Sequence, residues 1–175
     1  VKSVYDVFEN CSPAEYVAAI VMEPLQGEGG FIPAPIEFVK AVRKICDENG
    51  ILLIADEVQS GFGRTGKLFA SEYWKENGCA PDIIATAKSI AGGVPLSAVI
   101  ASKEVMDAVP GGTIGGTYGG NALACAAGLE VLKLMDEGGL VKRSQEIGKK
   151  VMAAFNEMKE KYEVVGDVRG LGAMI

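Results

Sequence analysis

The sequence has 175 residues, of which 49% are hydrophobic and 23 are glycine, and its formal net charge is −6. Because no basic block offsets this negative charge, nucleic acids and anionic membranes are poor candidate partners. No apolar run reaches the roughly 18 residues of a membrane span. The absence of histidine argues against a zinc site and against Ser-His-Asp or Cys-His catalysis.

Strands and helices are predicted to alternate along the chain, after a polar lead-in over residues 1–15. The predicted strands span residues 16–22, 51–55, 82–86 and 96–101. The predicted helices span residues 35–49, which ends at an Asn-Gly cap, 67–77, 103–109, 121–137 and 139–162. Loops join them over 26–30, 56–66 and 110–120, and 163–175 reads as the opening of another β unit. This alternation predicts an α/β fold with a parallel sheet covered by helices.

Two of the predicted strands end in a charged residue. The apolar run 51–55 is followed by Asp56, and the run 82–87 is followed by Lys88. Continuous apolar runs are typical of strands buried on both faces of a parallel sheet. Ligands of open α/β sheets bind beyond the carboxyl ends of the strands, so we expect a buried carboxylate and a buried amine in one crevice.

An amine and a carboxylate together suit a cofactor that is both an aldehyde and a pyridine. The amine can form a Schiff base with the aldehyde, and desolvation would lower its pKa from about 10.4. A carboxylate can hold the ring nitrogen protonated, which makes the ring an electron sink. The pair Asp56 and Lys88 therefore predicts pyridoxal phosphate, although a solvated strand-end lysine is the plainer alternative. Gln59 is either a donor to the ring hydroxyl or a solvated loop amide.

Other motifs leave alternatives open. Asp56 and Glu57 could bind a metal, or could be a helix cap and a surface charge, but no histidine or third carboxylate lies near them. Residues 61–66 read GFGRTG, a literal GxGxxG that would suit a dinucleotide-dependent oxidoreductase. A Rossmann glycine should directly follow the strand, whereas residues 56–60 intervene here. We therefore expect neither a metal nor a nicotinamide cofactor.

Two further segments have a functional and a plain interpretation. Residues 115–121 read GGTYGGN before a predicted helix, which suits a phosphate site containing Thr117 or an ordinary turn with an asparagine N-cap. Glu23 precedes a proline after a predicted strand. Its carboxylate is either solvated or held for a substrate or an arginine.

Taken together, five segments in this order resemble the class III (subgroup II) pyridoxal-phosphate aminotransferases, most closely the 4-aminobutyrate aminotransferase group. The matching segments are EPLQGEGG (23–30), LIADEVQSGFGRTG (53–66), AKSIAGGVPL (87–96), GGTYGGN (115–121) and GDVRGLG (166–172). The resemblance implies the large domain of the aspartate-aminotransferase type, with a mostly parallel sheet. It places residues 1–160 in this domain and residues 161–175 at the start of a truncated small domain.

The resemblance also implies a role for each candidate residue. Lys88 would carry the Schiff base and shuttle the proton, Asp56 would pair with the pyridine nitrogen, and Gln59 would contact the ring hydroxyl. Thr117 would bind the cofactor phosphate in the partner subunit's site. Glu23 would pair with an arginine of the small domain and move between half-reactions.

The activity implied by the resemblance is transfer of an amino group from an ω-amino acid such as 4-aminobutyrate to 2-oxoglutarate. Acetylornithine or ornithine aminotransferase is the alternative within the family. The chain lacks an initiator methionine and stops within a hydrophobic segment, so we expect it to be part of a longer protein. The part alone is expected to bind cofactor weakly or not at all, and could be only a folded core. The whole protein is expected to be a homodimer or larger assembly in the cytoplasm, where its four scattered cysteines would stay reduced.

Overall fold

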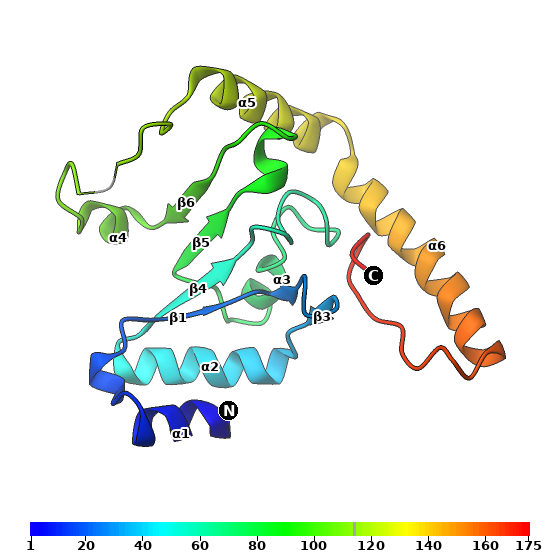
Figure 1. Ribbon diagram of the computed structural model, residues 1–175, viewed down its shortest axis with the longest axis horizontal. Helices are drawn as coiled ribbons and strands as arrows, with labels where there is room; N and C mark the ends of the chain where they lie inside the picture. Colours follow the sequence, from blue (N-terminus) through cyan, green and yellow to red (C-terminus); the bar gives the residue numbers. More distant parts are fainter. Residues whose placement is uncertain (114) are drawn as a thin grey trace.

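A four-stranded sheet with the order β1-β4-β5-β6 forms the centre of the computed structural model, which describes residues 1–113 and 115–175 (Figure 1). Strands β1, β4 and β5 are parallel, β6 runs antiparallel to β5, and β2 and β3 form a separate hairpin. The strands are β1 (Ala19–Met22), β2 (Leu25–Gln26), β3 (Ile32–Pro33), β4 (Leu52–Asp56), β5 (Ile83–Thr86) and β6 (Ala98–Ala101). The predicted α/β fold with a mostly parallel sheet is confirmed.

Helices connect and flank the strands. They are α1 (Lys2–Asn10), α2 (Ile36–Asn49), α3 (Glu72–Lys75), α4 (Lys103–Asp107), α5 (Ala122–Glu137) and α6 (Leu140–Lys161), with 3₁₀ turns η1 (Ala14–Tyr16) and η2 (Lys88–Ala91). Helix α2 ends as predicted, because Gly50 adopts the left-handed conformation (φ +67°) and its N–H bonds to Cys46 O. Among the described residues, no helix is both long and apolar enough to cross a membrane.

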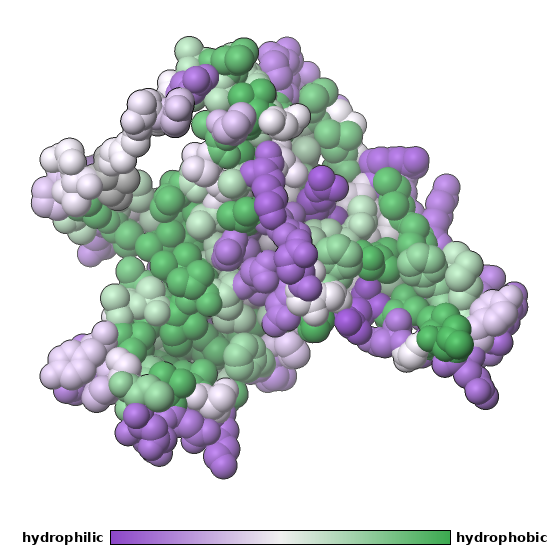
Figure 2. All heavy atoms as spheres, in the orientation of Figure 1, coloured by the Kyte–Doolittle hydropathy of each residue, from purple (hydrophilic) through white to green (hydrophobic). Residues whose placement is uncertain are grey.

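One face of the sheet packs on α2 and α3. Val39, Val42 and Trp74 are buried against Leu53 and Ala55 of β4. On the other face Leu52 and Ile54 are only half-buried and Val21 is 61% exposed, and Figure 2 shows hydrophobic residues gathered over the strands. The prediction that β4 is buried on both faces is therefore wrong for the described residues. Helices α2 and α3 cover the face that carries Leu53 and Ala55, and the face that carries Leu52 and Ile54 stays partly exposed.

The N-terminal segment is a helix, not the predicted polar lead-in. In α1, Tyr5 and Phe8 lie within one turn of each other and meet edge to face, with ring centroids 6.4 Å apart. Phe8 also packs against the core beside α2. Most residues of α1 are polar, but the apolar residues on one side of the helix are enough to pack it against the core beside α2.

The C-terminal residues follow α6 and do not form a further β unit. Only an isolated bridge joins Leu171 to Met174 among the described residues after α6. Gly148 of α6 lies so close to Gly172 that a Cβ on Gly148 would be 2.1 Å from Gly172 O. Ser144 Oγ and Ala173 N both donate to Arg64 O, at 2.9 Å each. The loop that contains Arg64 is thus held between α6 and the C-terminal segment.

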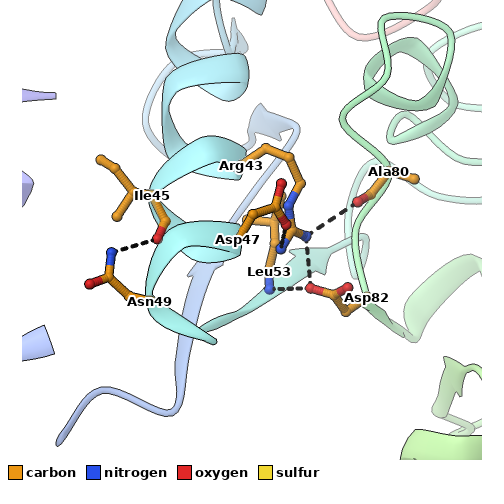
Figure 3. Close-up of polar contacts among 7 residues, drawn as sticks. All are labelled: Arg43, Ile45, Asp47, Asn49, Leu53, Ala80 and Asp82. Atoms are coloured by element: carbon orange, nitrogen blue, oxygen red, sulfur yellow. Dashed lines mark hydrogen bonds and ion pairs between the residues drawn. The ribbon is translucent and has the colours of Figure 1, made fainter. Parts of the chain in front are cut away.

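An ion pair ties α2 to the turn before β5 (Figure 3). Asp82 Oδ2 accepts from Arg43 Nη1 and from Leu53 N, at 2.7 Å each. Arg43 also pairs with Asp47 at 2.8 Å. Burial disfavours the charged guanidinium, but the hydrogen bond to Asp82 and the nearby carboxylates hold the pKa of Arg43 above its ordinary value.

We expect Asp82→Ala to lower the free energy of unfolding of the whole protein by about 2 kcal/mol, because Leu53 N and the guanidinium both lose an acceptor. The Asp82 side chain is 32% exposed, so the loss stays below the roughly 3–5 kcal/mol of a fully buried pair. Asp47→Ala is the matched control, because Asp47 is 65% exposed and its pair should contribute less than about 1 kcal/mol. Urea denaturation measures both, and equal losses would contradict the assignment.

Candidate active site

The ends of β4 and β5 bring Asp56 and Lys88 to the same edge of the sheet. Asp56 pairs in register with Ala85, and Lys88 follows β5 as the first residue of η2. Lys88 has a φ of +48°, which is uncommon for a residue with a side chain. Backbone strain of this kind clusters at functional sites. The edge that carries Asp56 and Lys88 is therefore a candidate for the functional site.

A polar cavity of about 360 Å³ opens beside Lys88, and we call it the Lys88 cavity. Its size falls within the range of small-molecule sites. Figure 2 shows hydrophilic residues in the middle of the view, near the ends of the central strands. The cavity lining consists of Glu28, Phe31, Gln59, Arg64, Lys88, Ser89, Ala173 and Met174. An amine, an amide, a carboxylate and a guanidinium therefore face one space.

Glu28 is a lining residue that the sequence analysis missed. Gln59 Nε2 donates to Glu28 Oε1 at 2.9 Å, and Gly27 permits the approach because a Cβ there would lie 2.4 Å from Gln59 Oε1. Glu23 is not among the lining residues; its Oε1 accepts from Gly27 N at 3.2 Å and it lines a different hollow near Phe38. A glutamate between glycines was the only signal for Glu28 in the sequence.

The expected burial of the amine is not found. Lys88 is exposed, and Asp56 is half-buried, with its Oδ1 accepting from Val58 N at 3.0 Å. Asp56 does not line the Lys88 cavity. Ser89 and Gly92, which are close to Lys88 in the sequence, carry little or no side chain, and the described residues leave Lys88 exposed.

A second cavity of about 770 Å³ also has Lys88 in its lining. Its other walls are residues 93–97 and the glycine-rich turns of 115–120, which include the exposed Thr117. Asn121 caps α5, with its side chain accepting from Ala124 N at 3.1 Å, so the predicted N-cap is confirmed. Thr117 and Lys88 of one chain thus line the same cavity. Ile114, within the predicted loop 110–120, lies outside the described residues.

The two rival motifs have the following surroundings in the structure. Residues 56–60 separate β4 from Gly61, and the next helix, α3, begins only at Glu72 and has four residues. In the part of the chain that the structure describes, no helix begins directly after the GxGxxG, so the helix N-terminus that would hold a pyrophosphate is not found there. Glu57 is 0% exposed, and its carboxylate accepts a hydrogen bond from Ser60, whereas the carboxylate of Asp56 accepts one from Val58. Within residues 1–113 and 115–175 there is no cluster of three His, Cys, Asp or Glu that could hold a metal.

The donor set fits a phosphorylated pyridine aldehyde. Lys88 supplies an exposed amine, Asp56 a carboxylate at the adjoining strand end, and Gln59 an amide inside the cavity. The turns around Thr117 supply backbone N–H groups and a hydroxyl beside the same lysine. Gly27 leaves room for the Gln59 side chain, since a Cβ there would lie 2.4 Å from Gln59 Oε1.

Comparison with known proteins gives consistent matches. A family model described as "Aminotransferase class-III" matches residues 2–175. The chain is 51% identical over its whole length to the 5-aminovalerate aminotransferase of Pseudomonas putida, and also 51% identical to the 4-aminobutyrate aminotransferase of Escherichia coli. It spans about 40% of the length of each of these relatives.

A solved structure matches the fold as well. An amine transaminase from an uncultivated Pseudomonas species, in a PLP-bound form, superposes with a TM-score of 0.87 at 37% sequence identity. This match covers 98% of the chain and 39% of the solved one.

Proposed function

The chain belongs to the class-III aminotransferases, and from this premise we propose that the whole protein moves an amino group from an ω-amino acid to 2-oxoglutarate with pyridoxal phosphate as cofactor. Its relatives named for 4-aminobutyrate and 5-aminovalerate support the choice of donor. The observation that carries the proposal is the Lys88 cavity, where an amine, an amide and both signs of charge converge.

When bound, pyridoxal phosphate supplies an aldehyde that takes up the amino group and a ring that withdraws electrons from the carbon losing its proton. Lys88 Nζ would hold the cofactor covalently and, once the donor's amino group has displaced it, would take the proton from the carbon that bears that amino group. The carboxylate of Asp56 would hold a proton on the ring nitrogen. Gln59 Nε2 would donate to the ring hydroxyl. Thr117 Oγ1 would bind the phosphate, in the partner subunit's site as the resemblance implies.

The charged residues of the Lys88 cavity would select the substrate. Arg64 offers a guanidinium that can pair with a substrate carboxylate. The carboxylate of Glu28, held by Gln59, faces the same space and would balance that charge when no acid is bound. The family resemblance gave this substrate role to Glu23, but the geometry favours Glu28, because only Glu28 lines the cavity.

We also propose that the whole protein is a homodimer or larger assembly, with Thr117 near the subunit boundary. Helix α5 supports this, because Leu123 is 72% exposed and Leu129 is 67% exposed on its surface. Such apolar surface favours contact with another chain. We assign residues 1–160 to the large domain and 161–175 to the start of the small domain. The end of α6 at Lys161, one residue beyond this boundary, supports the assignment.

The proposed function is tested with the purified whole protein, pyridoxal phosphate and pairs of substrates. We expect 4-aminobutyrate or 5-aminovalerate, with 2-oxoglutarate, to yield glutamate and to bleach the absorbance of the bound cofactor. Faster turnover with ornithine or acetylornithine would instead identify the protein as an ornithine or acetylornithine aminotransferase. If no amine changes the cofactor spectrum, the proposed function is wrong.

Comparing Glu28→Gln with Glu23→Gln tests which of the two glutamates has the substrate role. We expect Glu28→Gln to lower kcat/KM for at least one half-reaction by about tenfold or more, because it removes a charge from the Lys88 cavity. Glu23→Gln keeps an oxygen for Gly27 N and should change kcat/KM by less than about threefold. Stopped-flow measurement of each half-reaction provides the values, and a reversed order would return the substrate role to Glu23.

A further inference from the structure

Glu57 is a fully buried carboxylate to which the proposed reaction assigns no role. It follows Asp56, precedes Gln59 by two positions, and is 0% exposed. Its Oε2 accepts from Ser60 Oγ at 2.6 Å and from Ala70 N at 3.1 Å, and its Oε1 accepts from Ser71 N at 2.5 Å. In the part of the chain that the structure describes, it forms no ion pair.

These contacts close the loop that carries Gln59 and Arg64. The side chain of Glu57 reaches across 13 and 14 residues to the far end of this loop, where α3 begins. Its backbone is tied as well: Glu57 N donates to Ala85 O at 2.8 Å, and Glu57 O accepts from Gly61 N at 3.0 Å. The residue therefore joins the end of β4, the end of β5 and both ends of the loop.

The chemistry of the contacts requires a carboxylate. A carboxylate is an acceptor only, and all three neighbours of Glu57 are donors, of which two are backbone N–H groups that cannot turn away. A glutamine would place its own N–H₂ group against one of these N–H groups.

We propose that Glu57 is the positioning residue of the site, whose buried charge fixes the 56–59 turn so that Asp56 and Gln59 meet the cofactor ring. The inference rests on the proposed function. Asp56 Oδ1 accepts from Val58 N within this turn, at 3.0 Å, so the orientation of that carboxylate follows the backbone that Glu57 holds. Charge-assisted hydrogen bonds to a buried carboxylate are shorter and stronger than neutral ones. Such bonds are suited to holding the 56–59 turn in one conformation.

The test compares Glu57→Gln with Asp82→Asn in the whole protein. Both substitutions neutralise a carboxylate that accepts a backbone N–H. Asp82, however, precedes β5, whereas Lys88 follows it, so Asp82 is not part of the loop that carries Gln59 and Arg64. Three quantities are measured: the unfolding midpoint without cofactor, the Kd for pyridoxal phosphate, and the pH dependence of the bound cofactor's visible absorbance. We expect both variants to unfold at lower temperature. Only Glu57→Gln should weaken cofactor binding, by tenfold or more, and shift the pH profile.

A milder variant keeps the test decisive if Glu57→Gln does not fold. Ser60→Ala leaves the carboxylate with one donor fewer, so we expect Kd to rise about threefold and the pH profile to shift the same way. Unchanged cofactor affinity and pH profile in Ser60→Ala, or in a folded Glu57→Gln, would overturn the inference and leave the proposed function standing. If the unsubstituted whole protein binds no pyridoxal phosphate, the proposed function is wrong, and the inference about Glu57 falls with it.

Discussion

Replacing Lys88 by alanine is expected to remove the covalent attachment of the cofactor and to lower kcat by at least about 10³-fold, because one amine both holds the cofactor and moves the proton. The fold should survive. Lys88 is exposed, and alanine meets the same positive φ that lysine already tolerates. We therefore expect the free energy of unfolding to change by less than about 0.5 kcal/mol.

Borohydride reduction followed by peptide mass spectrometry measures the attachment. The unsubstituted protein should carry the reduced cofactor on the peptide that contains Lys88, and the variant should carry none. Lys103→Ala is the matched control, because Lys103 is an exposed lysine of α4 that lines neither cavity. Reduced cofactor found on another lysine, such as Lys67, would show that the assignment is wrong.

The second large effect is expected from Asp56→Asn, which should keep the covalent attachment but slow proton abstraction about 10²- to 10³-fold. An amide no longer holds the ring nitrogen protonated, so the ring withdraws electrons less strongly. The backbone should be preserved, because asparagine keeps the oxygen that accepts from Val58 N. The loss can therefore be assigned to charge and not to the shape of the turn.

Single-turnover kinetics with a donor deuterated at the reacting carbon isolates this step. The variant should show a slower rate with a full isotope effect, and the borohydride-reduced cofactor should still be found on Lys88. A rate within twofold of the unsubstituted protein would remove Asp56 from the role. Asp56→Glu provides a comparison that keeps the charge and displaces it.

The sequence predicted well what depends on local pattern. The cap at Gly50, the α2 helix and the end of β4 at Asp56 follow from apolar spacing and backbone preference, and the structure confirms them within a few residues. The parallel pairing of β4 with β5 then brings Asp56 opposite Ala85, near Lys88. To predict that Asp56 and Lys88 lie at one edge of the sheet, it was therefore enough to predict that their two strands are parallel neighbours.

What the sequence did not predict depends on contacts between distant segments. Glu28 reaches the Lys88 cavity because the β2–β3 hairpin lies across from Gln59, and no periodicity reports such a contact. Glu57 was interpreted as a metal ligand or surface charge, since its three donors come from other parts of the chain. Helix α1 was missed because its docking depends on a narrow apolar side.

The close approach of α6 to the C-terminal segment restricts how the protein can be redesigned. A Cβ on Gly148 would meet Gly172 O at 2.1 Å, and a Cβ on Gly172 would meet the Thr65 carbonyl carbon at 2.3 Å. Neither glycine lines the Lys88 cavity, yet any larger residue would wedge apart the helix and the loop that contains Arg64. A mutant library meant to widen substrate range should therefore vary Phe31 and Met174, which do line it, and keep both glycines fixed.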